Sequence, residues 1–257
     1  MEKLGLLAGV GKLPVECARA ASQSGYEVHA VALLDQTDPA VAEFAVDFKH
    51  ISIAHVQAIL DYLKDNDIHL VTMIGKVMPD VKFLELLLTL PDLKDDTVMM
   101  MFVRELEKIG CKTFDQTALI RQLMPSKGNI AHREPTADEM LDMEFGFKIA
   151  KEIGRLDIGQ TVVVKNRAVM AVEAIEGTDE CILRGGRLAN GGAVVVKVSK
   201  PQQDNRFDVP TVGLQTIERM IEVGATALAI EADQTLLVER DRVIELADKN
   251  NIAVTAI

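Results

Sequence analysis

The opening residues alternate between apolar runs and an amphipathic segment, and this pattern constrains the fold more than any other feature of the chain. Residues 3–8 predict a buried strand, the glycine turn at 9–11 ends it, and residues 13–24 predict a helix that stops at Gly25. A second apolar run at 27–34 follows at once. A strand, a helix and another strand in immediate succession are typical of a parallel α/β sheet.

The same alternation continues through the first half of the chain. Helices are expected at about 54–64, 82–88 and 98–109, and strands at 69–74 and 111–114. Strands that alternate with helices favour a doubly wound parallel sheet. The predicted fold class is therefore α/β, with a Rossmann-like N-terminal domain.

The alternation breaks at residues 124–136, which contain two prolines, a glycine and many polar side chains. A chain of 257 residues is also near the length at which one hydrophobic core divides into two. We therefore expect an N-terminal domain at 1–128, a linker at 129–135, and a C-terminal domain at 136–257.

The second half predicts a further α/β domain. Thr136 with Glu139 three residues later resembles a capping box, which starts a helix that runs to about residue 153. Asn166-Arg167 separates two β-rich runs as a hairpin turn would. Strands are expected at 161–165, 168–175, 193–198, 227–230, near 236 and at 252–255, and helices at 214–223 and 241–249.

Composition limits the compartment and the partners. The net charge of −11 makes general attraction to nucleic acid unfavourable. Three separated cysteines, Cys17, Cys111 and Cys181, suit a reducing compartment and are expected as core thiols. The N-terminus lacks the pattern of a secretory signal, and no apolar run approaches the length of a membrane span. We expect a cytoplasmic protein.

The first half offers two motifs that could bind a phosphate. Gly9-x-Gly11 lies between a strand and a helix, where backbone N–H groups can face a phosphate, but Pro14 replaces the third glycine of the dinucleotide fingerprint. A phosphate contact and a purely structural turn both stay open, and Gly75-Lys76 after its own strand presents the same choice. The five histidines show no metal-ligand spacing, which disfavours zinc chemistry.

Two segments of the second half carry side chains suited to phosphate chemistry. Residues 173–180 end an apolar strand with carboxylates, a glycine and a hydroxyl before a helix is expected. Thr178 can be the N-cap of that helix with Asp179 in its first turn, so a structural role stays open. Residues 197–213 form a loop rich in Lys, Arg, Gln and Asp, a composition that a solvated turn shares. Cations for phosphate oxygens, with carboxylates for Mg²⁺ or a water molecule, suit hydrolysis of a phosphoryl group.

Several stretches together form a recognisable signature. They are Asp157-Ile158-Gly159-Gln160, the run 171–179, Lys200-Pro201 through Arg206-Phe207-Asp208 to Pro210 and Gly213, and the opening Leu7-Ala8-Gly9-x-Gly11-x-Leu13-Pro14. This combination closely resembles the LpxI-type UDP-2,3-diacylglucosamine pyrophosphatases over nearly the whole chain. Val10 departs from the small residue expected in the glycine turn.

The resemblance implies an activity. It is the Mg²⁺-dependent hydrolysis of UDP-2,3-diacylglucosamine to UMP and 2,3-diacylglucosamine 1-phosphate (lipid X) in lipid A biosynthesis, with water attacking the sugar-side phosphorus. It also implies a Rossmann-like N-terminal domain, a C-terminal catalytic domain, and transient contact of the cytoplasmic protein with the inner membrane. A homodimer stays open. So do two other functions, a noncatalytic nucleotide-sugar or lipid carrier on the same fold and an NAD-linked oxidoreductase.

Residue roles follow from this resemblance together with the chemistry of a diphosphate. The expected catalytic residues are Asp208, Asp179 and Thr178, and the expected metal ligands are Asp208, Asp179 and Glu176. The expected substrate-binding residues are Gly9, Gly11, Lys12, Gly75, Lys76, Lys197, Lys200, Gln203 and Arg206.

Overall fold

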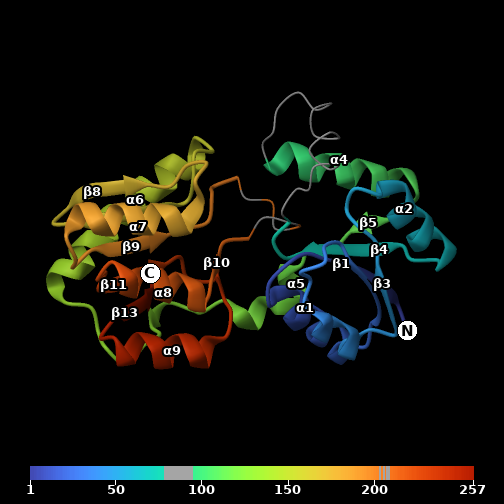
Figure 1. The fold of residues 1–257 in the computed structure, drawn as a ribbon, viewed down its shortest axis with the longest axis horizontal. Helices are drawn as coiled ribbons and strands as arrows, with labels where there is room; N and C mark the ends of the chain where they lie inside the picture. The colour runs from blue at the N-terminus through green and yellow to red at the C-terminus, as the bar shows by residue number, and fades with distance from the viewer. Residues whose placement is uncertain (78–94, 203, 205, 207–208) are drawn as a thin grey trace. The chain divides into compact units, whose positions relative to one another are not determined.

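The computed structural model describes residues 1–77, 95–202 and 209–257, together with Asp204 and Arg206 (Figure 1). These residues form two compact units, which divide between Ile120 and Arg121, and Asp204 and Arg206 group with the first unit. The helix expected at 82–88 and the site residues Gln203 and Asp208 lie outside the described residues.

The first unit contains a parallel sheet in the order β3-β2-β1-β4-β5. Its strands are β1 (Lys3–Ala8), β2 (Glu27–Ala32), β3 (Asp47–His50), β4 (Leu70–Ile74) and β5 (Lys112–Thr113), and its helices are α1 (Leu13–Gln23), α2 (Val56–Asp65), α4 (Asp95–Lys108) and α5 (Thr117–Ile120), with a 3-10 helix at Pro39–Phe44. Helices α1 and α5 cover one face and α2 and α4 the other (Figure 1). This strand order is that of a doubly wound fold, so the predicted α/β class is confirmed.

Alternation along the strands builds the core of this unit. Leu7 of β1 lies in register between Val31 of β2 and Met73 of β4, so these apolar side chains share one face of the sheet. They pack with Leu63 of α2 and Val103 of α4 in a single buried cluster. The amphipathic pattern of the two helices places them on this face.

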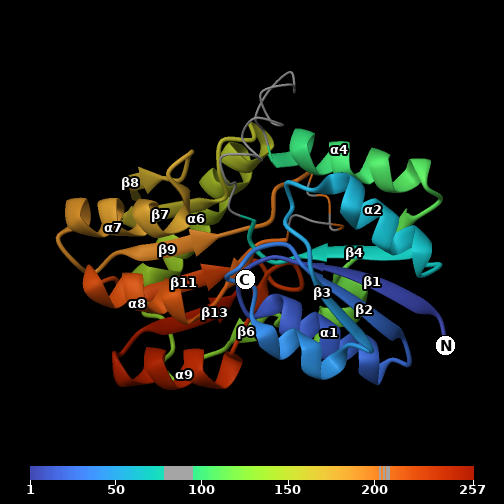
Figure 2. The ribbon, with the colours of Figure 1, turned by 45° about the vertical axis from the view of Figure 1, so that its right-hand side comes forward.

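The second unit contains a mixed sheet in the order β6-β13-β11-β9-β7-β8. Strands β9 (Val194–Lys197), β11 (Ala227–Ile230) and β13 (Ala253–Ala256) are parallel, while β6 (Gly128–Asn129), β7 (Thr161–Lys165) and β8 (Ala168–Val172) pair antiparallel with their neighbours. Helix α6 (Ala137–Arg155) packs on one face, and α7 (Gly177–Ala189), α8 (Leu214–Glu222) and α9 (Arg240–Lys249) pack on the other (Figure 2). A 3-10 helix at Arg121–Leu123 and a two-stranded pair, β10 (Thr211–Val212) with β12 (Leu236–Leu237), complete the unit.

Local signals in the second half have the expected geometry. The capping box at the start of α6 is confirmed, because Thr136 and Glu139 exchange both hydrogen bonds. The hairpin is also confirmed, since Asn166 and Arg167 both have positive φ, as a type I′ turn requires. The buried carboxylate of Asp142 on α6 accepts the N–H groups of both turn residues, at 2.8 and 2.6 Å. All three cysteines are buried and free, as expected for core thiols.

The segment expected as a linker packs onto the second unit. Within it, Asn129 pairs with β13, and Ile130 is buried in the core beside that strand. Arg133 donates to the carbonyls of Asn251 and Thr226 and forms a two-pronged contact with Glu139. The change from one unit to the other therefore comes before this segment, and Arg133 anchors it.

The Arg133–Glu139 pair predicts a pH dependence of stability. Burial raises the pKa of Glu139, but hydrogen bonds from Arg133 and from the Thr136 backbone outweigh it and lower the pKa from 4.5 to about 2. Because the pKa is lower in the folded state, the stabilisation is present above about pH 4.5 and is lost as the pH falls towards 2. Urea unfolding at several pH values should show Glu139→Gln less stable than wild type at pH 7, with the difference shrinking below about pH 4.5 and closing only as the pH approaches 2. A gap that is constant over this range would contradict the prediction.

Candidate functional site

Four strand ends of the second unit meet at one edge of its sheet. Lys197 ends β9, Glu231 follows β11, and Glu173 follows β8. Strand β7 is antiparallel to β9, so its first residue, Thr161, is in register with Lys197. The carboxyl ends of parallel strands are where α/β sheets take ligands. This edge therefore brings two carboxylates and one ammonium group to a position suited to a site.

The centre of the edge is a cluster of Glu173, Thr178 and Lys197. The Thr178 hydroxyl donates to Glu173 Oε1 at 2.7 Å, and Lys197 Nζ lies 3.2 Å from the same hydroxyl oxygen. Lys197 also donates to the carbonyl of Thr211 at 2.9 Å, and Glu173 accepts the N–H of Gln160 at 3.2 Å. Glu173 and Lys197 are both buried, at 8% exposure each. Buried ionic groups held this firmly keep a fixed geometry.

Thr178 therefore does not act as the helix cap that its position in the sequence allows. Helix α7 begins at Gly177, whose φ is +82°, and Glu176 occupies the N-cap position. This start places Thr178 inside the first turn, where its hydroxyl turns back to Glu173 instead of capping the helix. The hydroxyl therefore belongs to the cluster of Glu173, Thr178 and Lys197.

A second ionic cluster lies at the same edge on the α6 side of the sheet. Lys151 Nζ of α6 lies 3.0 Å from both carboxylate oxygens of Glu231, and it donates to the carbonyl of Ser199 at 2.8 Å. Glu231 accepts the N–H of Ser199 at 2.8 Å and donates its own N–H to the carbonyl of Lys197. We call these three residues, Lys151, Ser199 and Glu231, the loop-root clamp. The clamp fixes the chain where it leaves β9.

The loop after the clamp is held by the end of α6. Lys200 Nζ forms an ion pair with Asp157 at 2.9 Å, and the side-chain amide of Gln202 donates to the carbonyls of Gly154 and Arg155. Lys200 is only 16% exposed in this pair. The cation is therefore already neutralised by a carboxylate, so a phosphate would share it with Asp157.

Arg206 contacts Asp204 and Met100, which belong to the first unit. Its guanidinium pairs with Asp204 at 2.7 Å and contacts the sulfur of Met100 on α4. The hydrogen bond from Arg206 lowers the pKa of Asp204. The three cations predicted to meet phosphate therefore each have a partner: Lys197 has Thr178, Lys200 has Asp157, and Arg206 has Asp204.

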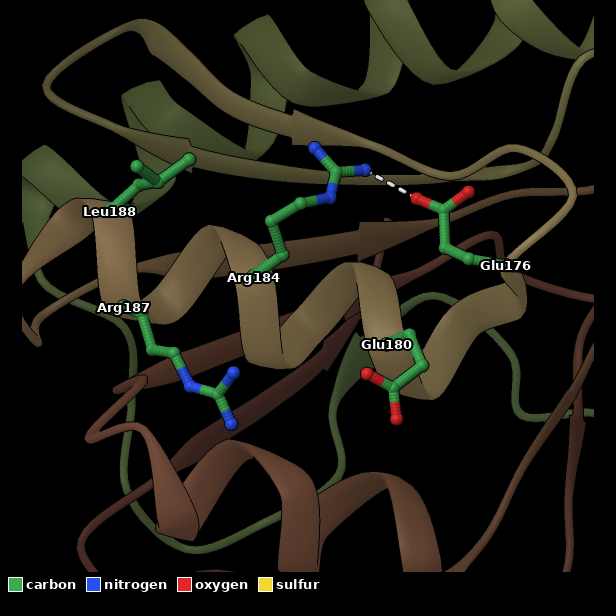
Figure 3. A pocket seen from close by; sticks show the side chains of 5 residues that line it. All are labelled: Glu176, Glu180, Arg184, Arg187 and Leu188. Atoms are coloured by element: carbon green, nitrogen blue, oxygen red, sulfur yellow. Dashed lines mark hydrogen bonds and ion pairs between the residues drawn. The ribbon is translucent and has the colours of Figure 1, made fainter.

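Of the expected metal ligands, Glu176 is paired with a cation and Asp208 lies outside the described residues. Glu176 pairs with Arg184 on the outer face of α7 and accepts the N–H of Ala174 (Figure 3). The Arg184 hydrogen bond lowers the pKa of Glu176, and the pocket around this pair is lined by Glu176, Glu180, Arg184, Arg187 and Leu188. Among the described residues, no three His, Cys, Asp or Glu side chains gather as a metal site would require. Mg²⁺ usually takes only one or two carboxylates together with substrate phosphates, and Asp208, one of the expected ligands, lies outside the described residues.

The glycine turn of the first unit is tied to the end of β4. Gly9 donates its N–H to the carbonyl of Ile74, and Val10 and Lys76 exchange both backbone hydrogen bonds. A Cβ at Gly9 would lie 2.7 Å from the carbonyl oxygen of Lys76, so glycine is needed there for close packing. The N–H groups of Gly9 and Val10 are therefore occupied by protein carbonyls.

The remaining first-unit candidates lie around this turn. Gly11 has φ of +109° and open space around its Cβ position, and Gly75 has φ of +96°. Lys12 pairs with Asp38 at 2.7 Å, and the side chain of Lys76 is exposed. Their role in binding a substrate stays a prediction.

Sequence reasoning missed four charged residues of the second-unit edge. Asp157 and Glu173 stand inside the recognised motifs, so the motifs themselves could have drawn attention to them. Lys151 lies in a helix and Glu231 directly after a strand, with no local pattern that marks either. Their roles depend on contacts between distant parts of the chain.

Comparison with protein families covers almost the whole chain. Residues 3–123 match the LpxI N-terminal domain, and residues 126–255 match the LpxI C-terminal domain. The chain belongs to the LpxI family. The LpxI C-terminal match contains the whole sheet edge with the Glu173–Thr178–Lys197 cluster and the loop-root clamp.

A full-length LpxI relative supports this membership. UDP-2,3-diacylglucosamine pyrophosphatase LpxI of Caulobacter vibrioides is 32% identical over 276 residues, a match that spans 100% of this chain and 98% of the relative. The similarity therefore includes both units and the region between them.

Two solved structures with some likeness to this LpxI chain resemble it only distantly. A glycinamide-RNase-transformylase T from Mycobacterium tuberculosis shares 12% identity at a TM-score of 0.30, over 50% of this chain and 38% of that one. An N5-carboxyaminoimidazole ribonucleotide synthetase from Thermotoga maritima shares 14% at a TM-score of 0.29, over 68% and 42%. Likenesses of this size carry no functional argument.

A membrane span calls for a long apolar helix, and the described parts of the chain include none.

Proposed function

We propose that this chain hydrolyses the pyrophosphate bond of UDP-2,3-diacylglucosamine and releases UMP and 2,3-diacylglucosamine 1-phosphate (lipid X), as a step of lipid A biosynthesis. The full-length relation to the Caulobacter vibrioides pyrophosphatase carries this proposal. The edge of the second-unit sheet supports it, because buried ionic groups there surround a hydroxyl that can take part in proton transfer.

Roles in the second unit follow from charge and position. We assign Lys197, Lys200, Gln203 and Arg206 to the substrate, with the cations near phosphate oxygens. Asp208 is the proposed general base or metal ligand, and Thr178 and Asp179 complete the catalytic set. In the first unit, Gly9, Gly11, Lys12, Gly75 and Lys76 remain the proposed substrate contacts.

Magnesium is proposed from the chemistry of the substrate alone. A divalent cation would neutralise the charge that develops on a diphosphate during hydrolysis. Because Glu176 is paired with Arg184, Asp208 and Asp179 are the stronger candidates for its ligands. The roles of the other side chains do not depend on the metal.

The acyl chains of the substrate call for apolar surface near the site. Leu156, Ile158 and Ile175 are exposed, and in the sequence they stand within three residues of Gly159 or Glu173. Exposed aliphatic side chains beside a polar site suit a ligand with lipid chains. They also support a cytoplasmic protein that contacts the inner face of the inner membrane transiently.

The decisive experiment measures UMP release from UDP-2,3-diacylglucosamine by the purified protein, with and without Mg²⁺. Release that needs Mg²⁺ would support both the activity and the cofactor. Release without Mg²⁺ would support the hydrolase activity and contradict only the proposed need for the metal. Binding of the substrate without release would favour a noncatalytic carrier. Micromolar affinity for NAD, measured by calorimetry, would favour the oxidoreductase instead.

A substitution in the loop-root clamp should lower the rate of UMP release more than its effect on stability explains. Glu231→Gln weakens the hold on Lys151 and Ser199, which should cost about 1.5–3 kcal/mol of unfolding free energy, the range for hydrogen bonds to charged groups. UMP release should fall about tenfold or more, because small displacements of positioned groups are costly in rate.

Glu139→Gln is the matched control for this substitution. It breaks the similarly buried Arg133–Glu139 pair in the same unit, away from the sheet edge. It should lower stability to a similar degree while leaving the rate of UMP release unchanged. Equal rate losses in the two variants would show that Glu231 acts only through stability.

A further inference from the structure

The hydrogen bonds of the Thr178 hydroxyl limit which group it can bind next. A hydroxyl has one hydrogen and two acceptor lone pairs. The carboxylate of Glu173 only accepts, so at 2.7 Å it takes the hydrogen of Thr178. The ammonium group of Lys197 only donates, so at 3.2 Å it occupies one lone pair. One lone pair remains, so the next hydrogen-bond partner of Thr178 must be a donor.

In a pyrophosphatase, Thr178 could contact either a diphosphate oxygen or the attacking water, and only the water is a hydrogen-bond donor. The oxygens of an ionised diphosphate only accept hydrogen bonds, so they offer nothing to the remaining lone pair. A water molecule can donate one O–H and keep its own lone pairs for a reaction. On the basis of the proposed hydrolase function, we infer that Thr178 holds the attacking water and that Glu173 sets the direction of the Thr178 hydroxyl.

Contacts on the other side of the Glu173 carboxylate hold it in the position where it accepts the Thr178 hydroxyl hydrogen. Its second carboxylate oxygen accepts the N–H of Gln160, and the glycine at position 159 lets the two chain segments approach closely. Gln160 Oε1 and Thr161 Oγ1, next to this contact, are buried and have no hydrogen-bond partner among the described residues. Buried polar atoms are normally satisfied by protein or by ordered water, so this region suits bound water.

The resulting step balances in atoms and charge. The water oxygen forms a bond to phosphorus, and the bond from that phosphorus to the bridging oxygen breaks, with its electron pair leaving on the departing phosphate. The water proton passes to the oxygen of Thr178 while the hydroxyl proton of Thr178 passes to Glu173. Lys197 stabilises the negative charge on the threonine oxygen during this exchange. Thr178 is then the catalytic residue, and Glu173 is a positioning residue that acts through it.

The test separates rate from binding. Thr178→Val keeps the shape and removes the hydroxyl, so kcat for UMP release should fall about 10²- to 10⁴-fold, the range for lost acid–base catalysis. Its KM should change by less than about threefold, because no diphosphate contact is lost. Thr178→Ser should keep most of the activity. In Glu173→Gln, kcat should fall similarly and KM should change by less than about threefold, because an amide cannot take the hydroxyl proton of Thr178.

Controls distinguish the ways in which the inference can fail. Thr255→Val removes a hydrogen-bonded hydroxyl from β13 and should leave kcat unchanged. If wild-type protein releases no UMP, the proposed function fails. If wild type is active but Thr178→Val raises KM tenfold and keeps kcat, Thr178 contacts the diphosphate and the inference alone is overturned. An inactive Thr178→Ser or a Glu173→Gln variant that keeps the wild-type kcat also overturns it, even if Thr178→Val does not fold.

Discussion

Replacing Gly159 with alanine should lower the free energy of unfolding by about 3 kcal/mol or more, at the upper end of the cost of overpacking. A Cβ at this position would lie 2.7 Å from the carbonyl carbon of Glu173 and closer still to its oxygen. Backbone atoms cannot rotate out of the way as a side chain can, so the two segments must separate. Because Glu173 holds the Thr178 hydroxyl, UMP release should be lost in any fraction that still folds.

Gly213→Ala is the control for this prediction. Gly213 has an extended backbone with φ of −151°, and its nearest neighbours to a new Cβ are 4.0 Å away. This substitution should change stability by no more than about 1 kcal/mol, the effect expected at a helix N-cap. Urea unfolding and UMP release measure both variants. If Gly159→Ala is as stable as Gly213→Ala, the close contact at Glu173 is not a constraint.

Asp208→Ala should reduce UMP release at least about 100-fold while leaving the fold intact, since the loss of a catalytic carboxylate typically costs that much or more. In the sequence, Asp208 comes two residues before Pro210 and three before Thr211. The carbonyl of Pro210 accepts the N–H of Leu236, and that of Thr211 accepts from Lys197. The chain is therefore anchored from Pro210 onward.

Substrate affinity should survive this change better than the rate, because uridine, the acyl chains and the cations bind independently of Asp208. UMP release at saturating substrate and Mg²⁺, together with a melting curve, checks the prediction. Asp65→Ala, which removes an exposed carboxylate of α2, is the control. It should change the free energy of unfolding by no more than about 0.5 kcal/mol and leave the rate of UMP release unchanged. A folded Asp208→Ala variant that keeps more than about a tenth of the wild-type turnover would exclude the catalytic assignment.

Most helices and strands of both units could be predicted from the sequence, because their signals are local. Apolar periodicity placed β1 and α1 within one residue of their observed ends, and the strand predicted at 161–165 is β7. Strand β3 (Asp47–His50) was not predicted. It lies at the sheet edge, and its residues are only partly buried or exposed, so it lacks the apolar alternation that marks a strand.

The sequence by itself determined the α/β class, the capping box, the hairpin turn and the family resemblance, all of which depend on residues near one another in the chain. Only the tertiary structure decided the partners of the charged side chains. Lys151 and Glu231 are 80 residues apart and meet because β11 pairs with β9 beneath α6. Thr178 can cap a helix or bind Glu173, and the start of α7 at Gly177 selects the second. Such choices follow from strand order and helix packing, which local sequence patterns do not encode.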